Sequence, residues 1–507
     1  MRRCQARLLI ALFLGFLGGA HSAHADLNHK LFLRNIERLA NEAATAEQEE
    51  QALNGLLNSD AHLDDPSQGS STQLTLALPI DPAQPKLGTF NQNYWVNATY
   101  ASGPNAPVLF FLCGEWTCSA NYNSMTTPIA KALGAYQVAV EHRFYGATQP
   151  FTTLSTENLQ YLRTDLALGD FAALQKNLML QGMTGPWIVV GASYSAALAA
   201  YYRQAYPELA AAAWASSGPV HAKADFYEYD RHVVQVLGPE CAGRAREALQ
   251  TIESALADPT TNSAIKARFN APSLSDDEFM DDLSGVPSGY VQYGGYDGFC
   301  STLMAPTAAA PVDGYLTAVQ NLWGTGELTS WIDVLKAEDD LTSGERQWFY
   351  QTCTEYGFWQ TAQHSPAISL RPQRIGLAYY TDICSKLFGI TSLVNTRPIN
   401  HDYYEPIVLK GSKIFFANGS NDPWSELSIQ PDNHNDLNPG LATAVSYGAF
   451  HCGDLSGKDF PDGSALAATR AFGISKLREW LDLPTPPPAP PVPVPAPAES
   501  PAPLAAQ

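Results

Sequence analysis

The sequence has few basic residues for its size. Its 507 residues contain 30 Lys and Arg against 50 Asp and Glu, which gives a formal net charge of −20 at pH 7. A surface of that charge repels a phosphate backbone, so we expect no nucleic-acid partner. Hydrophobic residues, at 45%, and aromatic residues, at 11%, are plentiful enough to exclude a mostly disordered chain and to build a large core.

Long apolar runs are scarce as well, and the one near the N-terminus is short. Leu8 to Leu17 follow three arginines and precede Ala23-His24-Ala25, an order typical of a secretory signal that is cleaved after Ala25. A membrane anchor is the alternative, but the run is too short to span a bilayer comfortably. Since no other segment is apolar enough to cross one, we expect an exported protein, secreted or periplasmic, with no membrane span in its mature form.

The cysteines lack the spacing of a metal site. The sequence has no C-x-x-C motif and no cluster of histidines and cysteines, so we disfavour zinc and expect no metal or other cofactor. Export permits disulfides instead, although spacing alone leaves their connectivity open. With Cys4 removed in the signal and Cys452 left over, the plausible local pairs are Cys113–Cys118, Cys241–Cys300 and Cys353–Cys384.

Strand-like runs alternate with helical patterns along the first half of the chain. The runs APVLFFL (106–112) and WIVVG (187–191) are apolar throughout, which is typical of strands buried on both faces. A helical pattern from Thr164 to Leu180 lies between them. This alternation predicts an α/β fold in which helices cover both faces of a parallel sheet.

The second half changes character and then returns to the strand pattern. Helical patterns dominate between about residues 221 and 404, after which KIFFA (413–417) and ATAVSYGAF (442–450) resume the buried-strand pattern. We therefore expect an α/β domain interrupted by a mainly helical insertion. The predicted order is a signal (1–25), the first part of the α/β domain beginning with an amphipathic helix (26–220), the insertion (221–404), the second α/β part (405–483) and a Pro-rich tail without a core (484–507).

The stretch WIVVGASYS places Ser193 between a buried strand and an alanine-rich helix. A serine at such a turn presents its hydroxyl at the carboxyl end of the sheet, as in the nucleophile elbow G-x-S-x-G. The final glycine of that motif is missing, but Ser195 stands in its place, and the requirement there is chiefly steric. An ordinary helix N-cap is the alternative for Ser193, and the motif alone does not decide between the two.

The expected partners of this serine follow later strands, in the order serine, acid, histidine that hydrolases of this layout use. Asp422 lies in the turn after KIFFA, and His451 follows the last strand-like run. His434 and His142 are alternatives, disfavoured because the first follows no strand and the second precedes the serine. We therefore expect His451 to take the proton of Ser193 and Asp422 to orient the imidazole.

An oxyanion formed at this serine needs two backbone N–H donors. We expect one from Tyr194, which follows the serine, and one from the loop after VLFFL, where Gly114 is the candidate. With serine, acid and histidine all present in order, the residues favour nucleophilic catalysis by Ser193 over a plain helix cap.

Several further motifs accompany these residues in a fixed order. They run from about Leu109 to Asp454 and read CGEW, EHRFYG, YLRTDLALGDFAAL, YQTCTEYGFWQT, NGSNDPWS and GAFHCGDL. With them the chain resembles the serine peptidase family of lysosomal Pro-X carboxypeptidase, dipeptidyl peptidase II and thymus-specific serine peptidase. The resemblance implies an α/β-hydrolase fold with a helical cap inserted between nucleophile and acid. It also implies hydrolysis of peptide bonds next to proline or another small residue.

The resemblance places the triad on the same three residues and adds two candidates for substrate binding. Trp424 of the D-P-W motif is a candidate wall of an apolar specificity pocket, with plain core packing as the alternative. Glu115 is a candidate contact for a substrate amino group; the alternative, which we favour, is a structural carboxylate paired with Arg143. Cys113 and Trp116 replace glycines of the family's G-G-E-G loop, and these departures bear on specificity more than on reaction type.

Three functions are compatible with these residues. The first is a secreted serine peptidase that acts on peptide or protein substrates through an acyl-enzyme. The second is an esterase or lipase of the same fold, but residues 275–300 are acidic and tyrosine-rich, whereas a lipase lid is markedly apolar. The third is a non-catalytic binding protein on a hydrolase scaffold, which we disfavour because no member of the triad is missing.

Overall fold

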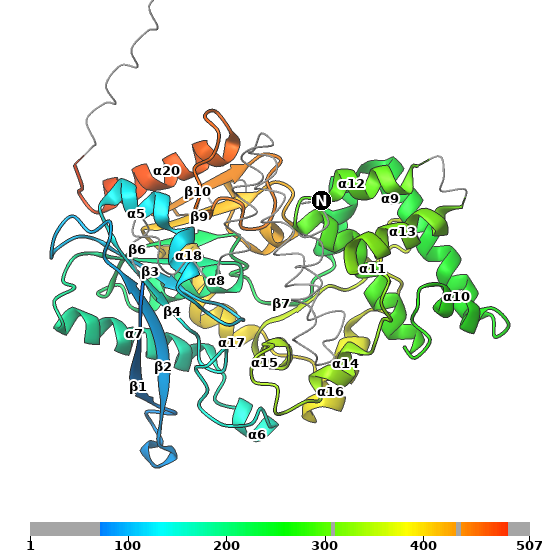
Figure 1. The fold of residues 1–507 in the computed structure, drawn as a ribbon, viewed down its shortest axis with the longest axis horizontal. Coiled ribbons are helices and arrows are strands. Elements are labelled where there is room, and N and C mark those ends of the chain that lie inside the picture. The colour runs from blue at the N-terminus through cyan, green and yellow to red at the C-terminus, as the bar shows by residue number, and fades with distance from the viewer. Residues whose placement is uncertain (1–70, 306–309, 432–437, 485–507) are drawn as a thin grey trace, which may run out of the picture.

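The computed structural model describes residues 71–305, 310–431 and 438–484 (Figure 1). The expected signal, the helix expected after it, His434 and the Pro-rich tail from residue 485 lie outside these ranges. The main strands are β1 (Thr72–Pro79), β2 (Thr89–Asn97), β3 (Val108–Leu112), β4 (Tyr136–Val140), β5 (Trp187–Ala192), β6 (Ala210–Ser216), β9 (Ile414–Gly419) and β10 (Leu441–Ser446). They form one sheet in the order β1-β2-β4-β3-β5-β6-β9-β10, antiparallel at the β1-β2-β4 edge and parallel from β4 to β10.

Both faces of the sheet are apolar and covered. In β3, Val108 and Phe110 pack into the core on one face, and Leu109 and Phe111 pack into the core on the other. Successive strand residues point to opposite faces, so a strand buried on both sides needs apolar residues at every position. The first face is covered by α7 (Thr164–Leu180) and α8 (Tyr194–Ala205), and the second by α5 (Thr127–Leu133) and α20 (Ala465–Trp480). The expected α/β fold is confirmed.

A mainly helical segment connects β6 to β9; most of it lies to one side of the sheet, while its last helices, α17 (Arg397–Ile399) and α18 (Glu405–Lys410), lie near α8 (Figure 1). Its elements include β7 (Lys223–Asp225), α9 (Glu228–Ala257), α10 (Asn262–Arg268), α11 (Asp276–Gln292), α12 (Tyr296–Leu303), α13 (Pro311–Trp323), α14 (Trp331–Leu335), α15 (Glu345–Gln351), η2 (Thr352–Tyr356), β8 (Gly357–Trp359) and α16 (Leu377–Phe388). This segment is the helical cap expected between the serine and the acid, although its proposed boundaries at residues 221 and 404 stay a prediction. Over the described ranges, no helix combines the length and apolarity needed to cross a bilayer.

The long helix α9 of this segment contains a break. Within α9, Gly238 has φ 73° and ψ 168°, outside the helical range, and Pro239 follows it. Glycine adopts a positive φ at little cost, and proline cannot donate the backbone hydrogen bond of a helix interior. The backbone of α9 is therefore interrupted at Gly238, although helical residues lie on both sides of it.

All three expected disulfides are present. Cys113–Cys118 closes the loop after β3, Cys241–Cys300 joins α9 to α12, and Cys353–Cys384 joins η2 to α16. Among the cysteines in the described ranges, Cys452 keeps a free thiol, also as expected.

Arg143 is a buried anchor of the loop after β4. Its guanidinium donates to both carboxylate oxygens of Asp170 in α7, at 2.6 and 2.8 Å. Replacing Arg143 by Met leaves the Asp170 charge buried and unpaired, so we expect the free energy of unfolding to fall by about 3–5 kcal/mol in denaturant titrations. Arg163→Met is the control: Arg163 and Asp165 are both half exposed, so the loss there should not exceed about 1 kcal/mol. Equal losses in the two variants would contradict the prediction.

Candidate active site

Ser193 occupies a strained turn between β5 and α8. Its φ of 59° and ψ of −128° lie outside the regions that non-glycine residues normally adopt, at a cost of about 1–3 kcal/mol. Packing holds the turn on both sides. The Ser193 N–H donates to the Ser216 carbonyl of β6 at 2.9 Å, and a Cβ on Gly191 would lie 2.0 Å from the Ser195 carbonyl oxygen. Only glycine can therefore precede this turn at position 191.

Ser195 takes the place of the missing glycine and contributes more than small size. Its side chain is buried, and its Oγ both donates to the Ala192 carbonyl and accepts from the Ala192 N–H, each at 2.9 Å. The backbone of Gly114 lies against it, since a Cβ on Gly114 would be 3.5 Å from the Ser195 Cβ. Serine therefore fits the close approach of strand, loop and helix, and it closes the turn with hydrogen bonds that glycine could not make.

Three side chains that follow β5, β9 and β10 form one hydrogen-bonded chain. The Oγ of Ser193 lies 2.8 Å from Nε2 of His451, and Nδ1 of His451 lies 2.9 Å from Oδ1 of Asp422. Both the histidine and the aspartate are buried, at 7% and 0% exposure. β10 ends at Ser446, earlier than the apolar run suggested, and a turn then carries His451 to the site. The structure brings together the three residues that the sequence singled out.

Asp422 controls the protonation of His451. Burial lowers the pKa of His451, but the Asp422 carboxylate and the neighbouring Cys452 together outweigh burial and hold that pKa well above its ordinary value. With its Nδ1–H donated to Asp422, the imidazole presents Nε2 as an acceptor for the Ser193 proton. The arrangement can therefore take a proton from the hydroxyl and stabilise the imidazolium that forms.

The two expected oxyanion donors lie next to this chain. Tyr194 begins α8, and the N–H groups in the first turn of a helix have no acceptor within the helix. The same helix end carries a partial positive charge, which favours a developing anion. Gly114 follows β3 and borders the start of α8 through Ser195. Their roles as oxyanion donors stay a prediction.

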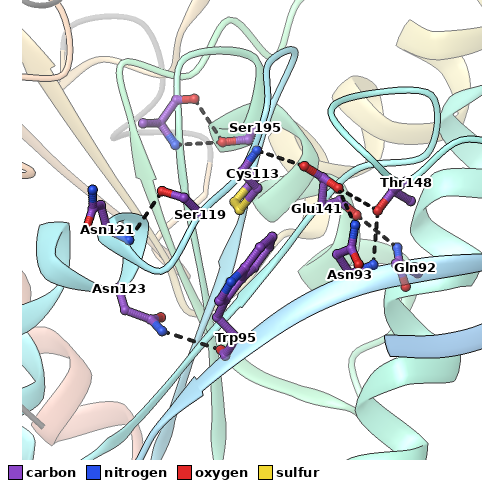
Figure 2. The surroundings of a disulfide bond; sticks show 12 residues. Gln92, Asn93, Trp95, Cys113, Ser119, Asn121, Asn123, Glu141, Thr148 and Ser195 are labelled. Carbon is purple, nitrogen blue, oxygen red and sulfur yellow. Dashed lines mark hydrogen bonds between the residues drawn. A yellow bond between two sulfur atoms is a disulfide. The ribbon is translucent and has the colours of Figure 1, made fainter. Parts of the chain in front are cut away.

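Glu141, which the sequence analysis missed, holds the loop after β3. Its Oε1 accepts from the Cys118 N–H at 2.9 Å, and its Oε2 accepts from Asn93 at 2.9 Å and from Thr148 at 2.7 Å (Figure 2). Together with the Cys113–Cys118 disulfide, this buried carboxylate fixes the loop that borders the nucleophile turn. Only its place in the motif EHRFYG could have pointed to it.

Glu115 does not pair with Arg143, so that interpretation was wrong. Arg143 instead binds Asp170, which offers both carboxylate oxygens from α7, while two backbone carbonyls take further guanidinium N–H groups. Oε2 of Glu115 is shielded from solvent and has no hydrogen-bond partner within the described part of the chain. Burial raises the pKa of Glu115 to about 7, against the lowering by its own backbone N–H and by the charge of His451. A carboxylate with one unpartnered oxygen thus lies within electrostatic reach of His451.

Trp424 lies beside the imidazole. Its half-buried ring is 6.3 Å from the ring of His451, centre to centre. On the side of the helical segment it packs against Phe226, Tyr229 and Phe358 at 5.6, 5.5 and 5.5 Å. The ring therefore takes part in core packing, as the alternative held, and it also borders the triad; its role as a pocket wall stays a prediction.

The side chain of Tyr194 joins the nucleophile turn to the helical segment. Its hydroxyl accepts from the Gln351 amide at 2.7 Å and lies 3.3 Å from Nε2 of His142, and its ring packs on Trp348 and Tyr356. Burial lowers the pKa of His142 to about 3, so this histidine stays neutral beside the hydroxyl of Tyr194. Gln351 belongs to the motif YQTCTE, whose structural task only the contacts reveal.

A family model and curated relatives match most of the chain. The family model of serine carboxypeptidase S28 matches residues 80–472. The "Probable serine protease EDA2" of Arabidopsis thaliana is 33% identical over 363 residues, which cover 68% of this chain and 73% of that protein. The thymus-specific serine protease of Mus musculus is 29% identical over 448 residues, which cover 80% and 87%. Among solved structures, the proline iminopeptidase of Mycobacterium smegmatis aligns with a TM-score of 0.40 at 12% identity, covering 81% of this chain and 99% of that one.

The family match includes the nucleophile turn, the turn after β9 and the turn that carries His451. The motifs that first suggested the family are therefore found within the matched residues. The chain belongs to the serine carboxypeptidase S28 family and is a serine-type peptidase.

Proposed function

We propose that this serine peptidase is secreted and cleaves peptide bonds next to proline or another small residue, using Ser193, His451 and Asp422. The observation that carries the proposal is the unbroken chain from the Ser193 hydroxyl through the imidazole to the Asp422 carboxylate, with distances of 2.8 and 2.9 Å. A nucleophile within hydrogen-bond reach of a base, which a third group orients in turn, is the geometry that covalent catalysis by serine requires.

In the first half of the reaction, the Ser193 Oγ attacks the carbonyl carbon of the scissile bond while its proton passes to Nε2 of His451. The carbonyl oxygen becomes an oxyanion, which the N–H groups of Tyr194 and Gly114 stabilise. The intermediate then collapses, the C–N bond breaks, and the leaving amine takes the proton from His451. The products of this half are an ester between Ser193 and the acyl part of the peptide, and a free amine.

In the second half, a water molecule attacks the ester carbonyl and gives its proton to Nε2 of His451. The C–O bond to Ser193 breaks, and the serine recovers its proton from the histidine. The product is a carboxylic acid, and the enzyme returns to its starting state. Asp422 keeps Nδ1 protonated throughout, so that Nε2 is the nitrogen that moves the proton in both halves.

The indole of Trp424 supports the preference for proline or a small residue. It presents a half-buried aromatic ring beside His451, and three further aromatic residues hold it in place. A rigid apolar ring is a suitable surface for a compact pyrrolidine, and a large flexible side chain would need more room. The three disulfides and the signal-like N-terminus support export to an oxidising compartment.

Membership of a peptidase family decides between the three functions that were compatible with the sequence. It favours the peptidase over an esterase or lipase and over a non-catalytic binding protein. The substrates are therefore peptides or proteins.

A labelling and cleavage experiment tests the proposal. The purified protein is incubated with a fluorophosphonate probe and with chromogenic Ala-Pro, Lys-Ala, Ala-Phe and blocked Gly-Pro peptides. We expect the probe to attach to Ser193, and Ala-Pro and Lys-Ala to be cleaved faster than Ala-Phe. Absence of label on Ser193 would sink the proposed mechanism. Equal cleavage of Ala-Phe would sink the proposed preference but leave the mechanism standing.

Glu115 is proposed to bind a substrate ammonium group, since Oε2 of its carboxylate has no hydrogen-bond partner among the described residues. We expect Glu115→Gln to lower kcat/KM for free-amine Ala-Pro about tenfold or more, with little effect on the blocked peptide, because a charge-assisted hydrogen bond is lost. In the parent enzyme the preference for the free amine should grow as pH rises through about 7, where Glu115 loses its proton, and the variant should lack this rise. The exposed Glu327→Gln is the control. A parallel loss on both peptides would contradict the assignment.

A further inference from the structure

Gln292, the last residue of α11, lies where the helical segment meets the loops that carry the triad. Its backbone carbonyl accepts from the N–H of His451 at 3.0 Å. Its side-chain Oε1 accepts from the indole N–H of Trp424 at 3.0 Å and also from the hydroxyl of Tyr229. One residue outside the central sheet therefore holds both His451 and the loop of residues 420–426 that carries Asp422, here called the acid loop.

These contacts close a ring of hydrogen bonds around the acid. Trp424 donates its backbone N–H to Oδ1 of Asp422 at 3.0 Å, and the same oxygen lies 2.9 Å from Nδ1 of His451. Gln292 closes the ring, because its side chain binds the indole of Trp424 and its backbone carbonyl binds the N–H of His451. The orientation of the imidazole thus depends on a residue that takes no part in the proton transfers.

The acid loop has other supports that do not involve Gln292. His232 of α9 lies 3.1 Å from the Ser420 carbonyl oxygen through Nε2 and 3.0 Å from Glu426 through Nδ1. Arg231 also binds Glu426, at 2.7 Å. The loop therefore keeps its attachment to α9 when the side chain of Gln292 is changed, so the contribution of Gln292 can be measured in a folded protein.

We propose that Gln292 is a positioning residue, which sets the orientation of His451 from the helical segment. The inference rests on the proposed function, in which His451 accepts the proton of Ser193. Without the amide oxygen, the indole N–H of Trp424 loses its acceptor, and the end of α11 is no longer tied to the acid loop. Because a displacement of about 1 Å can slow a reaction about a hundredfold, a partial loss of this restraint is expected to slow proton transfer about tenfold.

Gln292→Met tests the inference, since methionine is of similar length and lacks the acceptor oxygen. We expect kcat to fall about tenfold, and the rate at which diisopropyl fluorophosphate labels Ser193 to fall by a similar factor. This small probe has no peptide to seat against Trp424, so its rate reports on the triad. Gln292→Glu retains an acceptor oxygen and should restore labelling to within about threefold of the parent rate. Gln250→Met, on the exposed face of α9, is the matched control and should label at the parent rate.

A double-mutant cycle identifies the bond responsible. Trp424→Phe keeps an aromatic ring and removes the indole donor, so we expect it to slow labelling as well. Both changes remove the same hydrogen bond, from the indole of Trp424 to Oε1 of Gln292. The double variant should therefore be no slower than the slower single variant. Independent, multiplying losses would overturn the inference.

The remaining outcomes are separable. Labelling of Gln292→Met at the parent rate, with or without a change in KM, would overturn the inference and leave the proposed function intact. If circular dichroism shows that Gln292→Met is unfolded, Trp424→Phe decides: slowed labelling supports the inference, and labelling at the parent rate overturns it. A parent enzyme that the probe does not label at Ser193 would overturn the proposed function itself.

Discussion

Ser193→Ala is expected to lower kcat for peptide cleavage on the order of a millionfold. The change removes the one atom that forms the covalent bond in the proposed mechanism, and the residual rate would come from binding and the oxyanion donors alone. Peptide affinity should change little, since the hydroxyl is small and the buried neighbours of the turn stay in place. Initial rates with a chromogenic Ala-Pro peptide, together with fluorophosphonate labelling, measure the loss.

The control for this variant is Ser475→Ala, which removes an exposed serine of α20. It should match the parent enzyme in rate and in labelling. If Ser193→Ala kept cleavage within about a hundredfold of the parent, Ser193 would not be the nucleophile, because loss of a nucleophile costs far more than that.

Asp422→Asn is expected to lower kcat about ten-thousandfold at neutral pH. The same oxygen of Asp422, Oδ1, accepts from the Trp424 N–H and lies 2.9 Å from Nδ1 of His451, so an amide oxygen at that position keeps the loop bond but stabilises the imidazolium less. Where the NH2 group takes that position instead, it donates to Nδ1 of His451, which places the imidazole proton on Nε2 and leaves no acceptor for the Ser193 hydroxyl. Asp422 also raises the pKa of His451, and its loss removes the charge that stabilises the imidazolium.

The pH dependence of this variant has a definite sign. The parent enzyme gains activity as pH rises through the pKa of His451, since only the neutral imidazole accepts the proton. In Asp422→Asn that pKa falls, so the acidic limb of the pH profile should move to lower pH. Profiles of kcat/KM for the two enzymes test this, with the exposed Asp462→Asn as control. A limb that stays in place, or a kcat within about tenfold of the parent, would speak against Asp422 as the orienting acid.

The positions of the three reacting residues could be predicted because they depend on local pattern and on strand order. Ser193, Asp422 and His451 each follow an apolar run, and the carboxyl ends of parallel strands meet at one edge of a sheet. Residues far apart in the chain are thereby placed close together. The observed distances of 2.8 and 2.9 Å agree with that expectation.

β6 (Ala210–Ser216) shows where local pattern failed. Its sequence, AAAAWAS, is rich in alanine, which favours helices and is depleted in strands, so no strand was expected there. In the fold it lies between β5 and β9, with α8 packed on it and its carboxyl-terminal residue Ser216 bonded to the Ser193 N–H. Small side chains suit this crowded position, and the neighbours that create the crowding are distant in sequence.

The hydrogen-bond partners of buried polar groups could not be predicted from the sequence either. Glu115 and Arg143 were expected to pair, yet Arg143 binds Asp170, and Oε2 of Glu115 has no partner among the described residues. Gln292 lies in none of the motifs, and Glu141 was marked only by its place in EHRFYG. Their importance comes from the hydrogen bonds they make to loops far away in the chain.

The fold class and the order of nucleophile, acid and base could be read from the sequence alone, because each follows from local periodicity or from the geometry of parallel strands, whereas the three disulfide pairs were plausible from spacing and only the fold confirms them. The tertiary structure alone decided which polar groups hold those residues in place. A buried donor or acceptor must find a partner within about 3 Å. Which group stands there depends on how the helical segment packs against the sheet, and that packing joins residues whose separation along the chain carries no signal of their contact.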